Sequence, residues 1–181
     1  MPKMPKSGFT LIEMLVVIAV MALVGTFTLS NYKSFGEDQD LKSAVLDIQS
    51  QLRTAQTNST TNLKCEGVSD PDGPYGATWK VRFFDSTTIL LKCDKPPDSL
   101  EKRTLKLGAD IQIFSVSGTP AGSCPSIPPF SRFNISFTPL YGKMTIGDNT
   151  SCTSLTVTLE NTKTGSTKSL VIEQGGKIYA Q

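Results

Sequence analysis

The N-terminal part of the chain contains a carboxylate within a long apolar stretch, where carboxylates are rare. Glu13 is the single charged residue of the apolar stretch from Phe9 to Leu29. A carboxylate inside a membrane helix costs about 2.5–3.5 kcal/mol on insertion scales, so such residues are normally paired with a cation or used functionally. A nearby α-amino group would be a suitable partner, because a cation and a carboxylate form strong charge-assisted hydrogen bonds. The alternative is a Glu13 side chain that reaches water at the membrane surface.

The four cysteines are the second group of residues whose side chains could do chemistry. Cys65, Cys93, Cys124 and Cys152 all follow the apolar stretch, and their even number predicts two disulfides in an oxidising compartment. Of the three possible pairings we favour Cys65–Cys93 and Cys124–Cys152, because each closes a loop of about 28 residues, worth about 3 kcal/mol. A zinc site is the alternative, although the close Cys-x₂₋₄-Cys pair that zinc sites normally contain is missing.

Catalysis is not expected from this composition. The chain has no histidine, so it lacks the commonest general base and the commonest metal ligand. It also has no G-x-S-x-G nucleophile motif. We therefore predict no catalytic residue, no metal site, no cofactor and no enzyme activity. A net charge of +2 gives no indication of a nucleic-acid partner.

The N-terminal segment predicts a membrane anchor. The apolar stretch of residues 9–29 is long enough to cross a hydrocarbon core of about 30 Å and to contact membrane lipid. Lys3 and Lys6 precede it, which favours a cytoplasmic N terminus by the positive-inside bias. We thus expect a single-pass protein of the inner membrane, with everything after Tyr32 on the extracytoplasmic side.

The junction between these segments resembles a known motif. Gly8-Phe9-Thr10-Leu11-Ile12-Glu13, followed by an apolar helix, is similar to the prepilin motif of type IV pilins and type II secretion pseudopilins. The resemblance covers about residues 3–30. It implies cleavage between Gly8 and Phe9 by a prepilin peptidase, N-methylation of Phe9, and pairing of Glu13 with the new α-amino group of an adjacent subunit. It also implies other pilin subunits and an inner-membrane assembly platform as partners, and a function in assembly.

The fold class predicted for the whole chain is α+β. We expect a leader at residues 1–8, a transmembrane and assembly helix at 9–30, an amphipathic stalk helix at 31–60 and a β-rich head at 61–181. The stalk shows the apolar spacing of one helical face, at Leu41, Val45, Ile48, Leu52 and Ala55.

The head shows short alternating segments between Gly, Pro, Asp and Ser clusters, a pattern typical of strands and turns. Nine strands are predicted: Ala77–Phe84, Thr88–Lys92, Arg103–Leu107, Ile111–Ser117, Arg132–Thr138, Lys143–Ile146, Leu155–Glu160, Ser169–Glu173 and Lys177–Tyr179. Because their aromatic residues fall within these strands, we assign Trp79, Phe83, Phe84 and Phe137 to the core.

The C-terminal end carries a second, shorter resemblance. Gly176, Lys177 and Ile178 follow a predicted strand, as a glycine, a basic residue and an apolar residue do in GspH/FimT-like minor pseudopilins. This resemblance implies a minor filament subunit. Some relatives have Arg in place of Lys177, and a few of those bind DNA, so the lysine argues against a nucleic-acid partner. The alternative function is a minor pilin whose head binds DNA, a surface or a secreted substrate.

Overall fold

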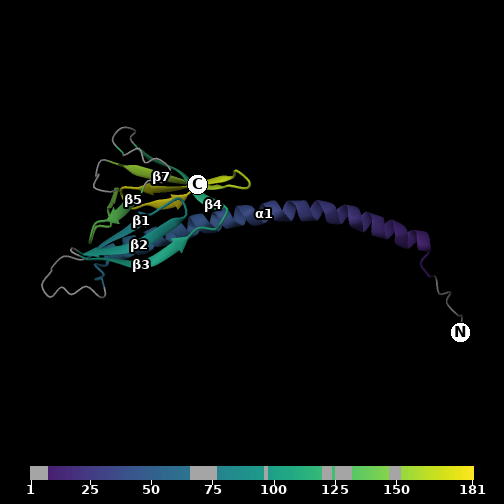
Figure 1. Cartoon of the computed structure of the whole chain (residues 1–181), viewed down its shortest axis with the longest axis horizontal. Coiled ribbons are helices and arrows are strands. Elements are labelled where there is room, and N and C mark those ends of the chain that lie inside the picture. The colour runs from purple at the N-terminus through teal and green to yellow at the C-terminus, as the bar shows by residue number, and fades with distance from the viewer. Residues whose placement is uncertain (1–7, 66–76, 96–97, 120–123, 125–131, 147–151) are drawn as a thin grey trace. The chain divides into compact units, whose positions relative to one another are not determined.

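The computed structural model describes residues 8–65, 77–95, 98–119, 124, 132–146 and 152–181, with only the backbone described at 27–34, 95 and 98–99. The chain divides into an N-terminal unit, Met1–Asp38, and a head, Gln39–Gln181. One helix, α1 (Leu11–Thr60), contributes to both units, and the described residues of the head contain nine strands, arranged as Figure 1 shows. The predicted α+β fold, an N-terminal helix packed against antiparallel sheets, is confirmed.

The strands form two antiparallel sheets. The five-stranded sheet has the order β3-β2-β1-β5-β6 and contains β1 (Thr78–Phe83), β2 (Thr88–Lys95), β3 (Asp98–Lys106), β5 (Phe133–Phe137) and β6 (Met144–Ile146). The four-stranded sheet has the order β4-β7-β8-β9 and contains β4 (Ile111–Thr119), β7 (Ser154–Asn161), β8 (Thr167–Glu173) and β9 (Ile178–Ala180). Connections between neighbouring strands are mostly hairpins.

Side-chain alternation places the core between the sheets and α1. Strand side chains point alternately to the two faces of a sheet, so every second residue is available for the core. In β1 the inward residues are Trp79, Val81 and Phe83. Phe137 is also fully buried, which confirms three of the four aromatic assignments. Phe84 was assigned wrongly: it is one residue out of phase, remains half-buried, and lies 4.1 Å from the Arg132 guanidinium.

The head part of α1 packs one face against this core. The predicted apolar stripe is confirmed, since Leu41, Ile48, Leu52 and Ala55 are all fully buried. The buried hydroxyl of Ser59 donates a hydrogen bond of 2.8 Å to the Phe137 carbonyl and thereby fastens the helix to β5.

The helix ends through a defined capping motif. Asn62 adopts a left-handed φ of 54°. Its N–H bonds the Ser59 carbonyl, and the N–H of Leu63 bonds the carbonyl of Asn58 at 2.9 Å. This is the Schellman arrangement, in which asparagine can replace glycine at the left-handed position. It explains why the helix stops near the Asn58–Asn62 segment, where the sequence predicted its end.

All nine predicted strands are present, most of them with ends shifted by one or two residues, and the largest difference lies in the β2–β3 hairpin. The β2–β3 hairpin extends to Lys95 and Asp98, whereas the sequence predicted strands that end at Lys92 and begin at Arg103. The register shifts between Leu91 and Lys92, and the pairs beyond that bulge are mostly polar. Polar pairs give no apolar alternation, so the sequence contained no signal for them.

Candidate functional site

The N-terminal site begins at the predicted cleavage point. Gly8, Phe9 and Thr10 precede α1, and all three are exposed. The Phe9 side chain is 81% exposed. The bond between Gly8 and Phe9 therefore lies in an accessible, non-helical segment at the start of the helix, where a protease could reach it. Residues 1–7 of the predicted leader lie outside the described residues.

Glu13 lies in the first turn of α1 and contacts Thr10. The Thr10 N–H faces the Glu13 Oε2 at 3.4 Å, while the Glu13 N–H faces the Thr10 Oγ1 at 3.3 Å. This reciprocal pair is a capping box, which satisfies two N–H groups that the helix itself leaves unbonded. The negative carboxylate also suits the positive end of the helix dipole.

Thr10 was not among the site residues predicted from the sequence. The signal was present, since Thr10-Leu11-Ile12-Glu13 has the [ST]-x-x-E spacing of a capping box before an apolar run. Glu13 thus has a structural role within its own chain. Its predicted pairing with a neighbouring subunit stays a prediction, because the structure contains a single chain.

The apolar side chains of the N-terminal unit are exposed. They project from every side of the helix and belong to Leu11, Ile12, Met14, Leu15, Val16, Val17, Ile18, Val20, Met21, Leu23 and Val24, each 44–84% exposed. A helix that is apolar all round is normally buried, either in a protein core or in a membrane. Within its own unit this segment has no such cover among the described residues.

Within the described residues, no helix is both long enough and apolar enough to cross a membrane.

The cysteines lie in the head and form two disulfides. Cys65 pairs with Cys93, and Cys124 pairs with Cys152, with Cα–Cα distances of 6.0 and 5.1 Å. These are the pairings that the equal spacing favoured. No cysteine remains free, so none is available for the alternative zinc site.

The predicted C-terminal motif forms the turn between β8 and β9 and is attached to α1. Gly176 has a left-handed φ of 87°, and its carbonyl accepts a hydrogen bond of 2.9 Å from Gln56 Nε2. A Cβ at this position would overlap the Gln56 amide and lie 3.3 Å from the Gly142 carbonyl. Glycine is thus required both by the backbone conformation and by the close approach of α1.

The side chain of Lys177 contacts Glu173 and Tyr179. Its ammonium lies 4.0 Å from a Glu173 carboxylate oxygen and 4.6 Å from the centre of the Tyr179 ring. The lysine side chain is 69% exposed, so these contacts leave it solvated. Gly176 therefore has a structural explanation in this fold, whereas Lys177 has a local ion pair and a cation–π contact.

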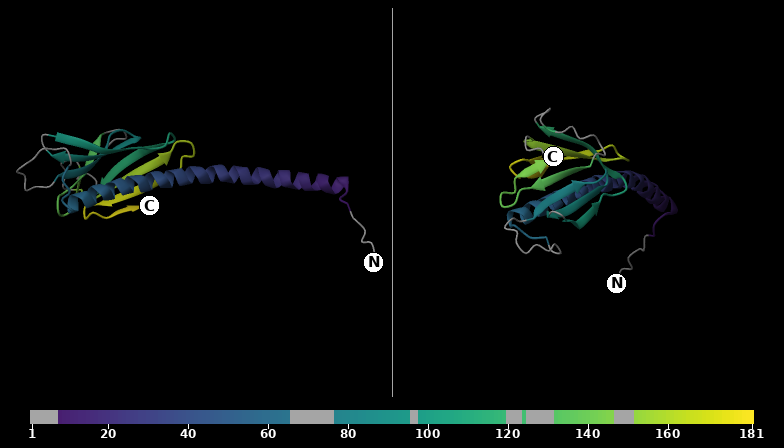
Figure 2. Two further views of the ribbon diagram at one scale, coloured as in Figure 1. Left: turned by 90° about the horizontal axis from the view of Figure 1, so that it is seen from below. Right: turned by 60° about the vertical axis from the view of Figure 1, so that its left-hand side comes forward.

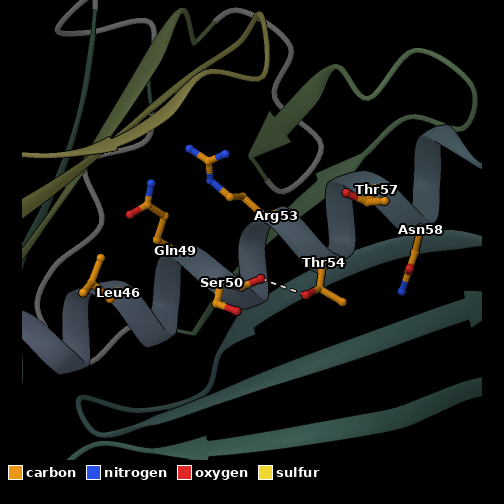
Figure 3. A pocket seen from close by; sticks show the side chains of 7 residues that line it. All are labelled: Leu46, Gln49, Ser50, Arg53, Thr54, Thr57 and Asn58. Carbon is orange, nitrogen blue, oxygen red and sulfur yellow. Dashed lines mark hydrogen bonds between the residues drawn. The ribbon is translucent and has the colours of Figure 1, made fainter.

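An open groove of about 520 Å³ follows the exposed side of α1 in the head (Figure 3). Its lining residues are Leu46, Gln49, Ser50, Arg53, Thr54, Thr57 and Asn58. Gln49 and Arg53 both donate hydrogen bonds to the Ile178 carbonyl, at 3.1 and 3.2 Å. Those bonds hold β9 beside the head part of α1, as the left view of Figure 2 shows. The groove is thus part of the attachment of β9, and Arg53 is its single charged lining residue.

These observations define the class of the protein: an α+β chain of pilin-like fold, with an apolar N-terminal helix followed by a β-rich head. A family model for the prokaryotic N-terminal methylation motif matches residues 3–29. The chain therefore carries the N-terminal methylation motif that type IV pilins and pseudopilins share. No curated protein and no solved structure matches the chain.

Proposed function

We propose that the protein is a structural subunit of a type IV pilus or a type II secretion pseudopilus. The observation that carries this function is the methylation motif at residues 3–29, which includes the start of α1, where the large apolar side chains from Leu11 to Val24 are exposed. A prepilin peptidase would cut between Gly8 and Phe9 and methylate the new N terminus. The apolar segment would be covered first by inner-membrane lipid and then by the same segment of neighbouring subunits.

The proposal also includes an orientation and a charge pair. Lys3 and Lys6 favour a cytoplasmic N terminus, with the head on the far side of the inner membrane. An assembly platform in that membrane would add the processed subunit to the filament. There the Phe9 α-amino group of one subunit would meet Glu13 of its neighbour, because an apolar surrounding strengthens the attraction between opposite charges.

A finer assignment, to the minor subunits of the GspH/FimT-like group, is supported by Gly176, Lys177 and Ile178 at the β8–β9 turn. A low copy number of the protein in isolated filaments would agree with it, and a copy number close to that of the whole filament would contradict it. The alternative, a head that binds DNA, gains nothing from Lys177, since its nearest described partners are Glu173 and Tyr179.

The test of the proposed function is the substitution Glu13→Ala in cells that assemble the filament. We expect the variant to be processed normally and to be lost from the sheared filament fraction. Asp47→Ala is the matched control, because Asp47 is an exposed acid of the same helix but lies in the head. Normal incorporation of the Glu13→Ala chain would contradict the role of this carboxylate in assembly.

Gly8→Ala tests the earlier step. The added methyl group would block the peptidase, and the uncut precursor would accumulate in the membrane fraction. Correct removal of the leader from this variant would contradict the proposed cleavage site.

A further inference from the structure

Two arginines lie close together on the outer face of the five-stranded sheet. In β1, Arg82 alternates with the buried Phe83 and therefore points outward. Its register partner on β5, the strand beside β1 (Figure 1), is Asn134. Arg132 precedes β5 and lies over the ring of Phe84, with its guanidinium carbon 4.1 Å from the ring centre. The two guanidinium groups thus occupy diagonal positions on neighbouring strands, a spacing that long side chains can bridge.

Two polar atoms at this position lack a hydrogen bond. The Nε of Arg82 and the Oδ1 of Asn134 are buried, and within the described part of the chain they bond neither each other nor any other group. A buried donor or acceptor without a partner costs free energy, and such atoms are uncommon in folded proteins. The positive charge of the nearby Arg132 adds repulsion. An anionic group from outside the chain would relieve both costs.

The neighbouring lysine shows what Arg82 lacks. Lys80 points to the same face of β1 and forms an ion pair with Asp94 of β2. Arg82 is opposite Leu90 on β2 instead, and Leu90 is only 7% exposed. Among the described residues, neither Arg82 nor Arg132 forms an ion pair with a carboxylate. Arg82 therefore has a buried apolar neighbour and no acid, and an ion pair is stronger in such surroundings than in water.

The side chains at this position suit a carboxylate. A guanidinium group has a planar fork of N–H donors that matches the two oxygens of a carboxylate. The amide of Asn134 can supply a further N–H donor beside Arg82. The ring of Phe84 supports the Arg132 guanidinium from one side and leaves its edge available for hydrogen bonds. We call Arg82, Asn134 and Arg132 the two-arginine site.

The surrounding charges favour one acidic group over a polyanion. Next to the two-arginine site, Lys80 is paired with Asp94, and on the following strands Lys92 is opposite Glu101. A strand of nucleic acid is bound by a groove of cations that follows its backbone, with several phosphates neutralised. Because acids alternate with the cations on this face, a single acidic side chain fits it better.

We propose that the two-arginine site binds an acidic side chain of a neighbouring filament subunit of a different kind. This inference rests on the proposed function, in which the chain is a minor subunit and its neighbours are mostly other proteins. The carboxylate would accept hydrogen bonds from the Arg82 Nε–H, the Arg132 guanidinium and the Asn134 amide. The contact would belong to the head, whereas the charge pair proposed at Glu13 belongs to the N-terminal unit.

The side-chain NMR signals of arginine test the site in the full chain, solubilised in detergent. The probe is a short glutamate peptide with blocked ends, and the control probe is a glutamine peptide of the same length. We expect the Nε–H signals of Arg82 and Arg132 to shift to saturation with the glutamate peptide alone. The signal of Arg103, an exposed arginine of β3, should stay in place. Arg82→Lys keeps the charge but loses the planar fork, so it should weaken binding about ten-fold.

Incorporation into the filament tests the contact in cells. Combining Arg82→Gln with Arg132→Gln should lower the amount of chain in the sheared filament fraction. The matched control is Arg103→Gln, which removes a positive charge from the same sheet outside the two-arginine site and should leave incorporation unchanged. Equal unfolding midpoints of the double variant and wild type would show that the double variant still folds. If the double variant is less stable, the peptide titrations of wild type and Arg82→Lys decide the question.

The outcomes separate this inference from the proposed function. Suppose that the wild-type chain begins at Phe9 and enters filaments. Equal incorporation of the folded double variant and the Arg103→Gln control, or equal responses to the glutamate and glutamine peptides, would then overturn the two-arginine site alone. A DNA strand of the same net charge that saturates the two signals at a lower concentration than the glutamate peptide would overturn the acidic side chain as the occupant. Absence of the wild-type chain from the filament fraction would overturn the proposed function, and the filament partner with it.

Discussion

The two parts of α1 use the same apolar residue types in opposite ways. In the N-terminal unit, residues such as Leu11 and Ile18 are 84% and 65% exposed. In the head, Ile48 and Leu52 are fully buried, and the outer side of the helix is mostly polar, with Leu46 as an exposed apolar residue. The head part thus completes a core within its own chain. The N-terminal part has an apolar surface that the described residues of its own unit leave uncovered, so stability resides in the head part, and the proposed assembly would use the N-terminal part.

The largest expected effect comes from a matched pair of leucines. Leu52→Ala should lower the free energy of unfolding of the head by about 2–5 kcal/mol, because it removes fully buried methyl groups and leaves a cavity. Leu23→Ala should change it by less than about 0.5 kcal/mol, because Leu23 is 64% exposed and lies in the other unit. Urea unfolding of the detergent-solubilised chain, followed by fluorescence of the single tryptophan, Trp79, measures both values. Equal destabilisation by the two substitutions would contradict the division of α1.

A second pair, of glycines, tests how the C-terminal turn is attached to α1. Gly165 and Gly176 both have left-handed φ values, 69° and 87°, so alanine costs about 1–2 kcal/mol of strain at either position. A methyl group added at Gly165 would have no neighbour within 4 Å, whereas one added at Gly176 would meet Gln56. Gly176→Ala should therefore cost about 0.5–1.5 kcal/mol more, because Gln56 loses its hydrogen bond to the turn. If the unfolding midpoints of the two variants coincide, the hydrogen bond between Gln56 and the turn contributes nothing to the stability of the head.

The capping box gives a smaller effect, confined to the N-terminal unit. Thr10→Ala should weaken the first turn of α1 by about 1 kcal/mol, whereas Thr10→Ser should retain the cap. Amide hydrogen exchange at Met14 should become about five-fold faster in the alanine variant, with the head unchanged. Faster exchange throughout the head would show that the two parts of α1 are not independent in stability.

The smallest expected effect is a pH dependence that belongs to the head alone. Burial acts to raise the pKa of Asp85, but hydrogen bonds from Thr87 and Thr88 outweigh it and lower the pKa below its ordinary value of 3.8. The ionised carboxylate therefore stabilises the folded head above that pH, and this contribution is lost as the pH falls through the lowered pKa. The unfolding midpoints of wild type and Asp85→Asn should converge on acidification. A difference that stays constant from neutral pH to pH 3 would contradict this account.

Local patterns in the sequence predicted most of the fold. The apolar stripe from Leu41 to Ala55 has helical spacing, and the strands have turn residues at their ends, so both were found without the structure. The division of the strands into two sheets was not predictable, because it depends on pairings between distant residues, such as β1 with β5. Phe84 was misassigned because its aromatic character was given more weight than its position next to the inward-facing Phe83.

The sites were predictable to different degrees. Glu13 and the four cysteines stand out by type and spacing, and the structure gives the cysteine pairs directly. Gln56 could not be found in this way, because its role depends on a turn 120 residues away in the sequence.

The N-terminal residue and the mass of the protein from membranes of cells with their own prepilin peptidase test the central claim most directly. We predict a chain that begins at Phe9 and whose measured mass exceeds the mass calculated for residues 9–181 by about one methyl group. A chain that still begins at Met1, or one cut beyond Leu29, would contradict it, because the apolar segment would then be an ordinary anchor or a removed signal.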